Sequence, residues 1–280
     1  MKCRCLRARV DSGISAGKRA AGRQIMNDRY DIAIEFDHVH YAVNGSRALI
    51  SDLNLAIHSG EILILLGRSG SGKSTTLKLM NRLLSPTQGE VRVIGRATDQ
   101  WDPIQLRRGM GYAVQEVGLF PHYTVEENVA LIPKAEGWDR SHIEGRVKEM
   151  LLLVGLPYEQ FARRYPHELS GGQRQRVGLA RALAANPPIL LMDEPFGALD
   201  PLTRAELQRE FKLLQKRLGK TVVFVTHDVT EALLLGDRIA LLERGASVGV
   251  FTPEEFLRSS EENAKAYVEI FRSGFQLLNE

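Results

Sequence analysis

The chain has 280 residues, of which 44% are hydrophobic and 25% are charged, a composition that suits a globular protein and excludes a wholly disordered one. Its formal charge of +3 is unevenly spread, because residues 1–25 carry seven basic side chains and only Asp11, a net +6 that leaves −3 for the rest. A nucleic-acid-binding domain needs its basic residues clustered on the folded part, so we exclude nucleic acid as a partner.

Residues 1–27 are predicted to form a disordered basic extension, since their glycine, serine, alanine and arginine residues cannot bury a core. Cys3 and Cys5, the only cysteines, lie in this extension at a spacing that fits neither a zinc site nor a disulfide framework. The extension lacks the apolar stretch of a secretion signal, and no apolar run in the chain approaches the roughly 18 residues of a membrane span. We therefore expect a chain that is soluble by itself in a reducing compartment.

Residues 28–280 are predicted to form one folded domain that begins with strands. From Asp31 onward the segment IAIEFDHVHYAV alternates between apolar and polar residues, and ALISDLNLAI follows it. After a break at residues 58–60 comes the continuous apolar run EILILL at 61–66. A run that is apolar on both faces predicts a strand buried inside a parallel sheet, and therefore an α/β fold.

The segment GRSGSGKS at 67–74 matches a phosphate-binding loop and lies in the required context, between that strand and an amphipathic helix predicted over 75–84. Its glycines allow backbone N–H groups to turn onto phosphate oxygens, and the helix N-terminus adds a favourable dipole. We expect Lys73 to reach the β- and γ-phosphates of ATP and the Ser74 hydroxyl to bind Mg²⁺. The residues expected at the nucleotide are Gly67, Arg68, Ser69, Gly70, Ser71, Gly72, Lys73, Ser74 and Thr75.

A second glycine loop, ELSGGQRQRV at 168–177, opens another predicted helix and raises the question of which phosphate it serves. Ser170, Gly171 and Gly172 offer a hydroxyl and free N–H groups, which together make an anion site. That site binds either an unrelated anion or the open side of an ATP held by another copy. We favour the second alternative, because a two-fold homodimer of identical chains then closes two ATP sites at once.

Two further buried strands end in polar residues. PPILLMDEP at 187–195 ends in adjacent carboxylates, of which Asp193 suits the Mg²⁺ side of the site and Glu194 suits the orientation or activation of the attacking water. TVVFVTHD at 221–228 ends in His227, which can bond a γ-phosphate oxygen. Open α/β sheets collect their chemistry at the carboxyl ends of strands. We therefore predict Glu194 and His227 as catalytic residues.

The segments GRSGSGKST, LSGGQ, ILLMDEP, ALD and TH, in this order over residues 67–227, resemble the nucleotide-binding subunit of an ABC transporter, and the likeness covers residues 30–260. The resemblance implies a RecA-like P-loop core, an antiparallel β flank on the N-terminal side and an inserted helical subdomain at about 116–186. A helical tail is expected over about 253–280. Helical spacing without a convincing strand across the inserted region agrees independently.

The resemblance also implies roles for residues outside the two glycine loops. Tyr41 would stack on adenine, and Gln115 would sense Mg²⁺ and the γ-phosphate while touching a membrane permease. Gln173 would serve the partner's ATP together with Ser170 and Gly172, and Asp200 would communicate across the dimer. Arg68 stands where many relatives carry proline, at a variable position.

The implied function is ATP hydrolysis that powers uptake of a small solute through separate transmembrane permease subunits, served by an extracytoplasmic solute-binding protein. Such a subunit lies peripherally on the cytoplasmic face of the membrane. The apolar loop at 118–121 is either a permease-docking patch or ordinary loop packing. A soluble ABC ATPase acting on DNA or ribosomes would need a long coiled-coil insertion or two cassettes, and the sequence has neither. A non-hydrolysing module would be expected to lack Glu194 or His227, and both are present. We therefore expect neither class.

Several long segments, among them LKLMNRLLSPTQGEV and DPIQLRRGMGYAVQEVGLFPHYTVEENVALIPKAEGW, are similar to the ATPases of importers for quaternary-amine osmoprotectants such as glycine betaine, carnitine or choline. Many of those relatives continue into CBS domains, which are not expected in a chain that stops at Glu280. The first alternative is an importer for taurine, nitrate or amino acids, and the second, which we favour less, is an exporter.

Overall fold

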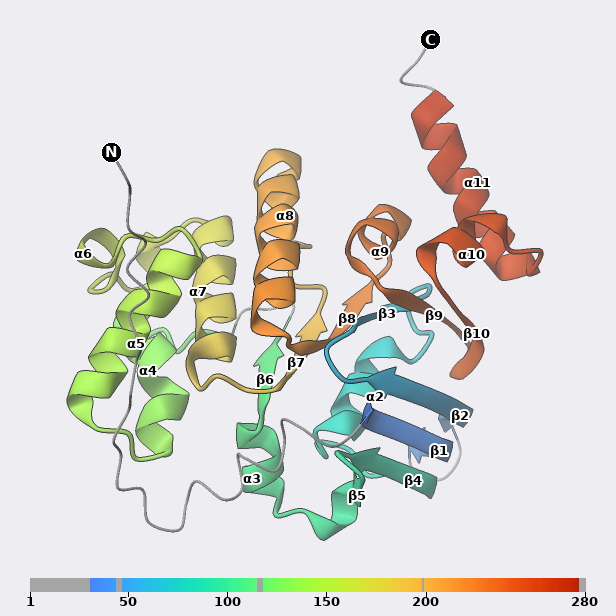
Figure 1. Cartoon of the computed structure of the whole chain (residues 1–280), viewed down its shortest axis with the longest axis horizontal. Coiled ribbons are helices and arrows are strands. Elements are labelled where there is room, and N and C mark those ends of the chain that lie inside the picture. Colours follow the sequence, from blue (N-terminus) through green and yellow to red (C-terminus); the bar gives the residue numbers. More distant parts are fainter. Residues whose placement is uncertain (1–30, 44–46, 115–117, 198, 277–280) are drawn as a thin grey trace, which may run out of the picture.

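The computed structural model describes residues 31–43, 47–114, 118–197 and 199–276. The extension predicted over residues 1–27 therefore lies outside the described residues. Within them the chain forms two sheets, with a group of helices set to one side (Figure 1). This arrangement confirms the predicted α/β fold class. None of the helices in the described ranges is long and apolar enough to cross a membrane.

The N-terminal sheet is antiparallel, with the strand order β2-β1-β4-β5. Its strands are β1 (Ile32–Val43), β2 (Arg47–His58), β4 (Gln88–Val93) and β5 (Arg96–Ala97). The alternation in β1 and β2 buries one face, on which Ile34, Phe36 and Ile57 lie inside. The antiparallel flank expected on the N-terminal side is thus confirmed.

The second sheet has the strand order β10-β9-β3-β8-β7-β6, and neighbouring strands are parallel except β10 with β9. Its strands are β3 (Ile62–Leu66), β6 (Met110–Ala113), β7 (Ile189–Asp193), β8 (Thr221–Thr226), β9 (Arg238–Glu243) and β10 (Ala246–Phe251). The three adjacent strands β3, β8 and β7 are buried along their whole length. Because they are parallel, the polar residues after each of them meet at one edge of the sheet.

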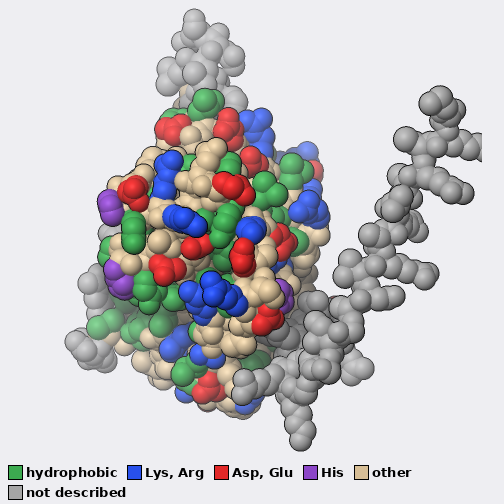
Figure 2. All heavy atoms as spheres, turned by 90° about the vertical axis from the view of Figure 1, so that its left-hand side faces the viewer, with side chains coloured by type: hydrophobic (Ala, Val, Ile, Leu, Met, Phe, Trp, Pro, Cys, Tyr) green, Lys and Arg blue, Asp and Glu red, His purple; other side chains and the backbone are tan. Residues whose placement is uncertain are grey.

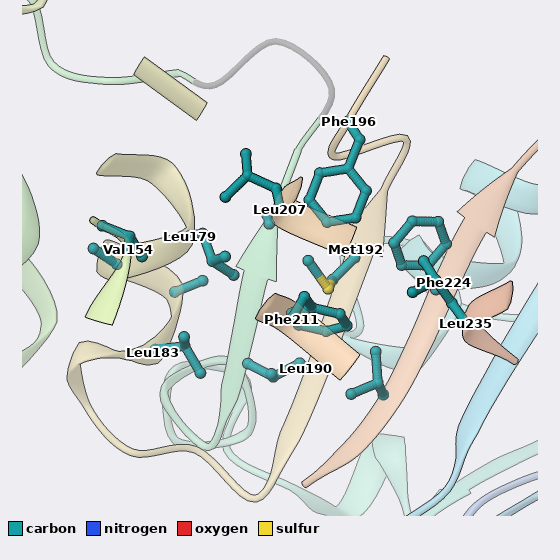
Figure 3. Close-up of a cluster of buried hydrophobic side chains, with 14 of the residues drawn as sticks. Val154, Leu179, Leu183, Leu190, Met192, Phe196, Leu207, Phe211, Phe224 and Leu235 are labelled. Carbon is teal, nitrogen blue, oxygen red and sulfur yellow. The ribbon is translucent and has the colours of Figure 1, made fainter. Parts of the chain in front are cut away.

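Strand β3 separates two hydrophobic clusters, since successive side chains point to opposite faces. Ile62, Ile64 and Leu66 join a cluster with the helices, whereas Leu63 and Leu65 join one with the antiparallel sheet. Figure 3 shows the first cluster, in which aromatic and aliphatic side chains of β7, β8 and the neighbouring helices interdigitate. The sheet edge that carries the polar residues is therefore supported by packed core on both faces.

Helices α4, α5, α6 and α7 lie together beyond β6 (Figure 1). Their bounds are α4 (Val125–Ala135), α5 (Arg140–Leu153), α6 (Tyr158–Phe161) and α7 (Gly171–Ala184), with the 3₁₀ turn η2 (Pro166–Glu168) before α7. No strand occurs between residues 118 and 186, a range that the structure describes completely. The apolar stripe of α5 packs into the first cluster through Val147, Met150 and Leu151.

The other helices flank the sheets. They are α2 (Lys73–Met80), α3 (Pro103–Arg108) after the 3₁₀ turn η1 (Thr98–Gln100), α8 (Pro201–Leu218), α9 (Val229–Leu235), α10 (Pro253–Arg258) and α11 (Glu262–Gln276). The prediction of a helix over 75–84 was wrong at its end, because Arg82 adopts a left-handed φ of 53°. The N–H groups of Leu83 and Leu84 instead donate to the Lys78 carbonyl and close the helix.

Candidate functional site: a phosphate-binding loop at the carboxyl edge of the sheet

The phosphate-binding loop follows β3 at the edge where β7 and β8 also end. Gly70 and Gly72 have φ values of 80° and 102°, a left-handed region that glycine enters without the steric cost of a Cβ. Gly72 is also the N-cap of α2, so the first turn of the helix opens directly onto the loop. Backbone N–H groups at such a helix start suit an anionic ligand.

Gly67 is packed too closely for a side chain, which gives a direct test of the loop. A Cβ on Gly67 would overlap the carbonyl oxygen of Leu242 and lie 2.5 Å from Ser71 Oγ. Overpacking of this kind costs about 1–3 kcal/mol, so we expect Gly67→Ala to displace the loop and weaken ATP binding about tenfold or more. Titration with a fluorescent ATP analogue measures the affinity.

Gly145→Ala is the matched control, because a Cβ on Gly145 of α5 meets nothing within 4 Å. This control is expected to leave ATP affinity unchanged and to raise the free energy of unfolding by roughly 0.5–1 kcal/mol, since alanine loses less backbone entropy in a helix. Equal ATP affinities for the two variants would contradict the close packing at Gly67.

Lys73 is buried at the start of α2, where its Nζ donates to the carbonyl oxygens of Gly67 at 2.7 Å and Arg68 at 2.9 Å. Burial lowers the pKa of Lys73, and the neighbouring carboxylates of Glu194 and Asp193 partly oppose that shift. The ammonium group therefore lies inside the loop, bonded to groups that phosphate oxygens can replace.

Asp193, the last residue of β7, faces the start of α2. Its Oδ1 accepts a hydrogen bond from Ser74 Oγ at 3.1 Å. Burial is the largest influence on Asp193 and raises the pKa of its carboxyl, whereas the Ser74 hydrogen bond lowers it. A carboxylate and a hydroxyl side by side are the hard oxygen ligands that Mg²⁺ prefers, so these residues fit the predicted metal.

Glu194 and His227 come from adjacent strand ends and meet. Glu194 Oε1 lies 3.1 Å from His227 Nδ1, and the Glu194 side chain is 20% exposed while that of His227 is 65% exposed. Glu194 also has a left-handed φ of 44°, a conformation that costs a non-glycine residue energy and is typical of functional sites. The backbone thus places the Glu194 side chain in the pocket lining at the expense of local strain.

A pocket of about 810 Å³ opens beside the loop. Its lining combines loop residues between positions 68 and 75 with Glu194 and His227, as the sequence predicted. Gly67 and Ser71 also belong to the loop, but they are buried and do not line the pocket. Helix α11 also lines the pocket, through Asn263 and Tyr267, which sequence reasoning missed because a helical pattern does not indicate where the helix will dock.

The second glycine loop lies away from the pocket at the phosphate-binding loop. Ser170 is the N-cap of α7, where its Oγ accepts from the Gln173 N–H at 3.2 Å and its own N–H donates to Gln173 Oε1 at 2.9 Å. None of the residues from Ser170 to Gln173 lines the pocket at the phosphate-binding loop. One copy of the chain therefore presents an exposed helix start that its own phosphate-binding loop does not use.

The remaining candidates differ in how they relate to the pocket. Tyr41 on β1 is half-buried against the second hydrophobic cluster and is not part of the pocket lining, so its role at adenine stays a prediction. Asp200 is the N-cap of α8 and accepts from the Thr203 N–H at 3.0 Å, and its cross-dimer role also stays a prediction. Gln115 lies outside the described residues.

Comparison with known proteins assigns the family. A family model described as ABC transporter matches residues 50–197, more than half of the chain. The chain belongs to the ABC transporter family. Among solved structures of the family, an ATP-binding cassette seen as a dimer in a post-hydrolysis state with ADP and Pi superposes with a TM-score of 0.71 at 36% identity, covering 79% of this chain and 98% of that cassette.

Two curated relatives within this family are informative. A carnitine transport ATP-binding protein of Listeria monocytogenes is 49% identical over 85% of this chain and 59% of its own length. A glycine betaine uptake system ATP-binding protein of Escherichia coli is 50% identical over 77% of this chain and 69% of its own length. The chain thus spans about three fifths of the length of the first relative.

Proposed function

We propose that this chain binds and hydrolyses ATP as the nucleotide-binding subunit of an importer for a small solute. The observation that carries the proposal is the meeting of Lys73, Glu194 and His227 at one pocket, beside the pair formed by Ser74 and Asp193. We further propose that residues 28–280 are a single ATPase domain, with a helical subdomain at about 116–186 and a helical tail at about 253–280.

In the proposed mechanism the phosphates of ATP enter the loop and take over the Lys73 hydrogen bonds to the Gly67 and Arg68 carbonyls. Glu194 accepts a hydrogen bond from the water that attacks the γ-phosphate, which orients the water, and takes up its proton as the new bond to phosphorus forms. His227 donates to a γ-phosphate oxygen and keeps that group in line with the water. Mg²⁺ held by Ser74 and Asp193, with the predicted Gln115, would neutralise phosphate charge when bound.

In the proposed mechanism the second glycine loop couples ATP binding and hydrolysis to the association and separation of two copies of the chain. In a two-fold dimer the residues from Ser170 to Gln173 would bind the ATP of the partner copy, so ATP would hold the two copies together and hydrolysis would release them. The cassette of 36% identity, which is dimeric with ADP and Pi bound, supports the pairing of two copies. Opening and closing can then drive any partner that binds the two states unequally.

The proposed partner that senses this motion is a membrane permease, on whose cytoplasmic face the chain would lie. Phe120, in the apolar loop at 118–121, is 40% exposed next to the helical layer. Figure 2 shows the side of the molecule that lies at the left of Figure 1, where basic and acidic side chains are interspersed with hydrophobic ones. The acidic side chains among the basic ones make this face a poor match for the polyanionic backbone of a nucleic acid.

The proposed cargo is a quaternary-amine osmoprotectant such as glycine betaine, carnitine or choline, delivered by an extracytoplasmic solute-binding protein. The support is the names of the curated relatives, which include a carnitine and a glycine betaine transport protein at 49% and 50% identity. The pocket at the phosphate-binding loop does not contact the cargo in this proposal, so cargo choice lies with the partners.

The cargo is tested by deleting the gene for this chain in its own cell and measuring uptake of radiolabelled glycine betaine, carnitine and choline. We expect uptake of at least one solute to fall, to return with the wild-type gene and not to return with Glu194→Gln. Undiminished uptake of all three would contradict the cargo. Phosphate release by the purified chain decides the ATPase proposal separately.

A further inference from the structure

We propose that Glu231 is a positioning residue that holds His227 at the nucleotide pocket by fixing the end of β8 through Thr226. The inference concerns a residue that does not line the pocket, and it rests on the ATPase function proposed above. It follows from a set of hydrogen bonds behind the pocket that joins β8, α9 and α8.

Glu231 lies in the first turn of α9 and is only 7% exposed. Its Oε2 accepts from Thr226 Oγ1 at 2.5 Å, and its Oε1 accepts from Gln208 Nε2 at 2.8 Å. Burial raises the pKa of this carboxyl, while the bonds to Thr226 and Gln208 and the nearby Arg204 guanidinium act in the other direction. A carboxyl group so deep in the protein is tolerated because each of its oxygens has a partner.

The Thr226 hydroxyl makes two bonds that bracket His227. It donates to Glu231 and accepts from the N–H of Asp228 at 2.9 Å, so the residues before and after His227 are tied to the same group. Asp228 in turn caps α9 by accepting from the Thr230 N–H at 2.7 Å. The turn that carries His227 is therefore closed by contacts that do not involve its own side chain.

His227 depends on this turn because its side chain is too exposed to be held by packing. The imidazole reaches Glu194 Oε1 at 3.1 Å, a contact between groups on two different strand ends. Loss of the Thr226 anchor would free the backbone of His227 and lengthen or misalign that contact. Displacements of about 1 Å at a reacting group cost as much as 10²-fold in rate.

The same carboxyl connects His227 to the helix that starts at Asp200. Gln208 and Arg204 both lie on α8, and Arg204 Nη2 donates to the Leu199 carbonyl at 3.1 Å, immediately before the Asp200 cap. Gln208 thus bonds the carboxyl that anchors the end of β8, and the Arg204 guanidinium acts on that carboxyl electrostatically. Glu231 thereby links His227 to the segment that follows Glu194.

Glu61 is a matched control that separates a positioning role of Glu231 from a purely stabilising one. It is a buried acid that lies before β3, at the opposite end of the parallel strands. Glu61 is 8% exposed, and its Oε1 accepts from the His58 N–H at 2.7 Å and from Arg238 Nη1 at 3.2 Å. The two acids share burial, charge and hydrogen bonding, but Glu61 precedes β3 whereas Glu231 anchors the carboxyl end of β8.

The experiment compares Glu231→Ala, Glu231→Gln and Thr226→Val with Glu61→Ala. Three quantities are measured: kcat and KM for ATP, the affinity for a fluorescent ATP analogue, and the imidazole Cε1–H resonance of His227, assigned by its absence in His227→Ala. We expect Glu231→Ala to lower kcat about tenfold to a hundredfold, with ATP affinity within twofold of wild type and a shifted His227 resonance.

Glu231→Gln keeps one oxygen that can accept from Thr226, and its NH2 group can donate to the Gln208 amide oxygen once that amide rotates, so the variant is expected to recover most of the lost kcat. Thr226→Val removes the hydroxyl and keeps the size of the side chain, so it is expected to reproduce the effects of Glu231→Ala. It provides the same test if Glu231→Ala fails to fold. Glu61→Ala is expected to lower the melting temperature without moving kcat or the His227 resonance.

An unchanged kcat and an unchanged His227 resonance in both Glu231→Ala and Thr226→Val would overturn the inference. A fall in kcat shared with Glu61→Ala would overturn it too, because the effect would then be loss of stability. Absence of ATP hydrolysis by the wild-type chain would instead overturn the proposed function, and the His227 resonance would still decide the positioning role.

Discussion

Glu194→Gln is expected to lower the ATP turnover of the purified chain by about 10²- to 10⁴-fold, the range that a general base contributes. The substitution keeps the size of the side chain and removes the group that can accept a proton from water. Glu194 lines the pocket without belonging to the loop that holds the phosphates, so ATP affinity is expected to stay near the wild-type value. Single-turnover phosphate release and nucleotide titration measure the two quantities.

Glu206→Gln is the control for the loss of one carboxylate, because Glu206 lies exposed on α8 away from the pocket lining. Its turnover is expected to match the wild type. If Glu194→Gln also turned over at the wild-type rate, the assignment of Glu194 as the base would be wrong. A parallel loss of ATP affinity would instead make Glu194 a binding residue.

Ser170→Arg is expected to abolish ATP-dependent dimerisation. The measurement is sedimentation or light scattering in the Glu194→Gln background, in which ATP persists, with and without ATP and Mg²⁺. Ser170 is exposed at the start of α7 and is outside the pocket of its own chain, so the added side chain would block only the surface offered to a second copy. Monomers are expected to pair with ATP in the parent and to stay single in the variant.

The new arginine also removes a helix cap, which costs about 1 kcal/mol, so its effect on stability has to be separated. Asp139→Arg likewise removes the N-cap of a helix, here α5, and places the same side chain at an exposed position in the same helical layer. This control is expected to dimerise like the parent. A dimer that persists in Ser170→Arg would show that the second glycine loop does not serve the partner's ATP.

The sequence was sufficient to predict which strand ends come together at the pocket, because each of them follows a strand that is apolar on both faces. The glycine-loop motif predicts Lys73 and the strand ends predict Glu194 and His227, and the structure brings all three to one pocket. The same logic could not find Glu231, because a glutamate in the first turn of a helix is ordinarily a solvated residue. Only the packing of α8 and β8 around it buries its carboxyl.

The sequence also did not predict that α11 lines the pocket or that the backbone of Arg82 is left-handed. The approach of α11 to the pocket depends on how the C-terminal helices pack, which no local pattern encodes. The early end of α2 depends on a left-handed arginine, a conformation that sequence patterns favour for glycine or asparagine and not for Arg82. Both features arise from tertiary contacts that override local preference.

The strand order sets the sequence of events as the chain is made. The antiparallel sheet draws its strands from residues 32–97, so it can form while the chain is still short. Strand β3 pairs with β8 and β9, which lie more than 150 residues later. Contacts of such long range are slow to form, and synthesis proceeds from the N-terminus. The strands that flank β3 therefore leave the ribosome long after the phosphate-binding loop, and the sheet edge that supports the loop is completed only when β8 and β9 have been made.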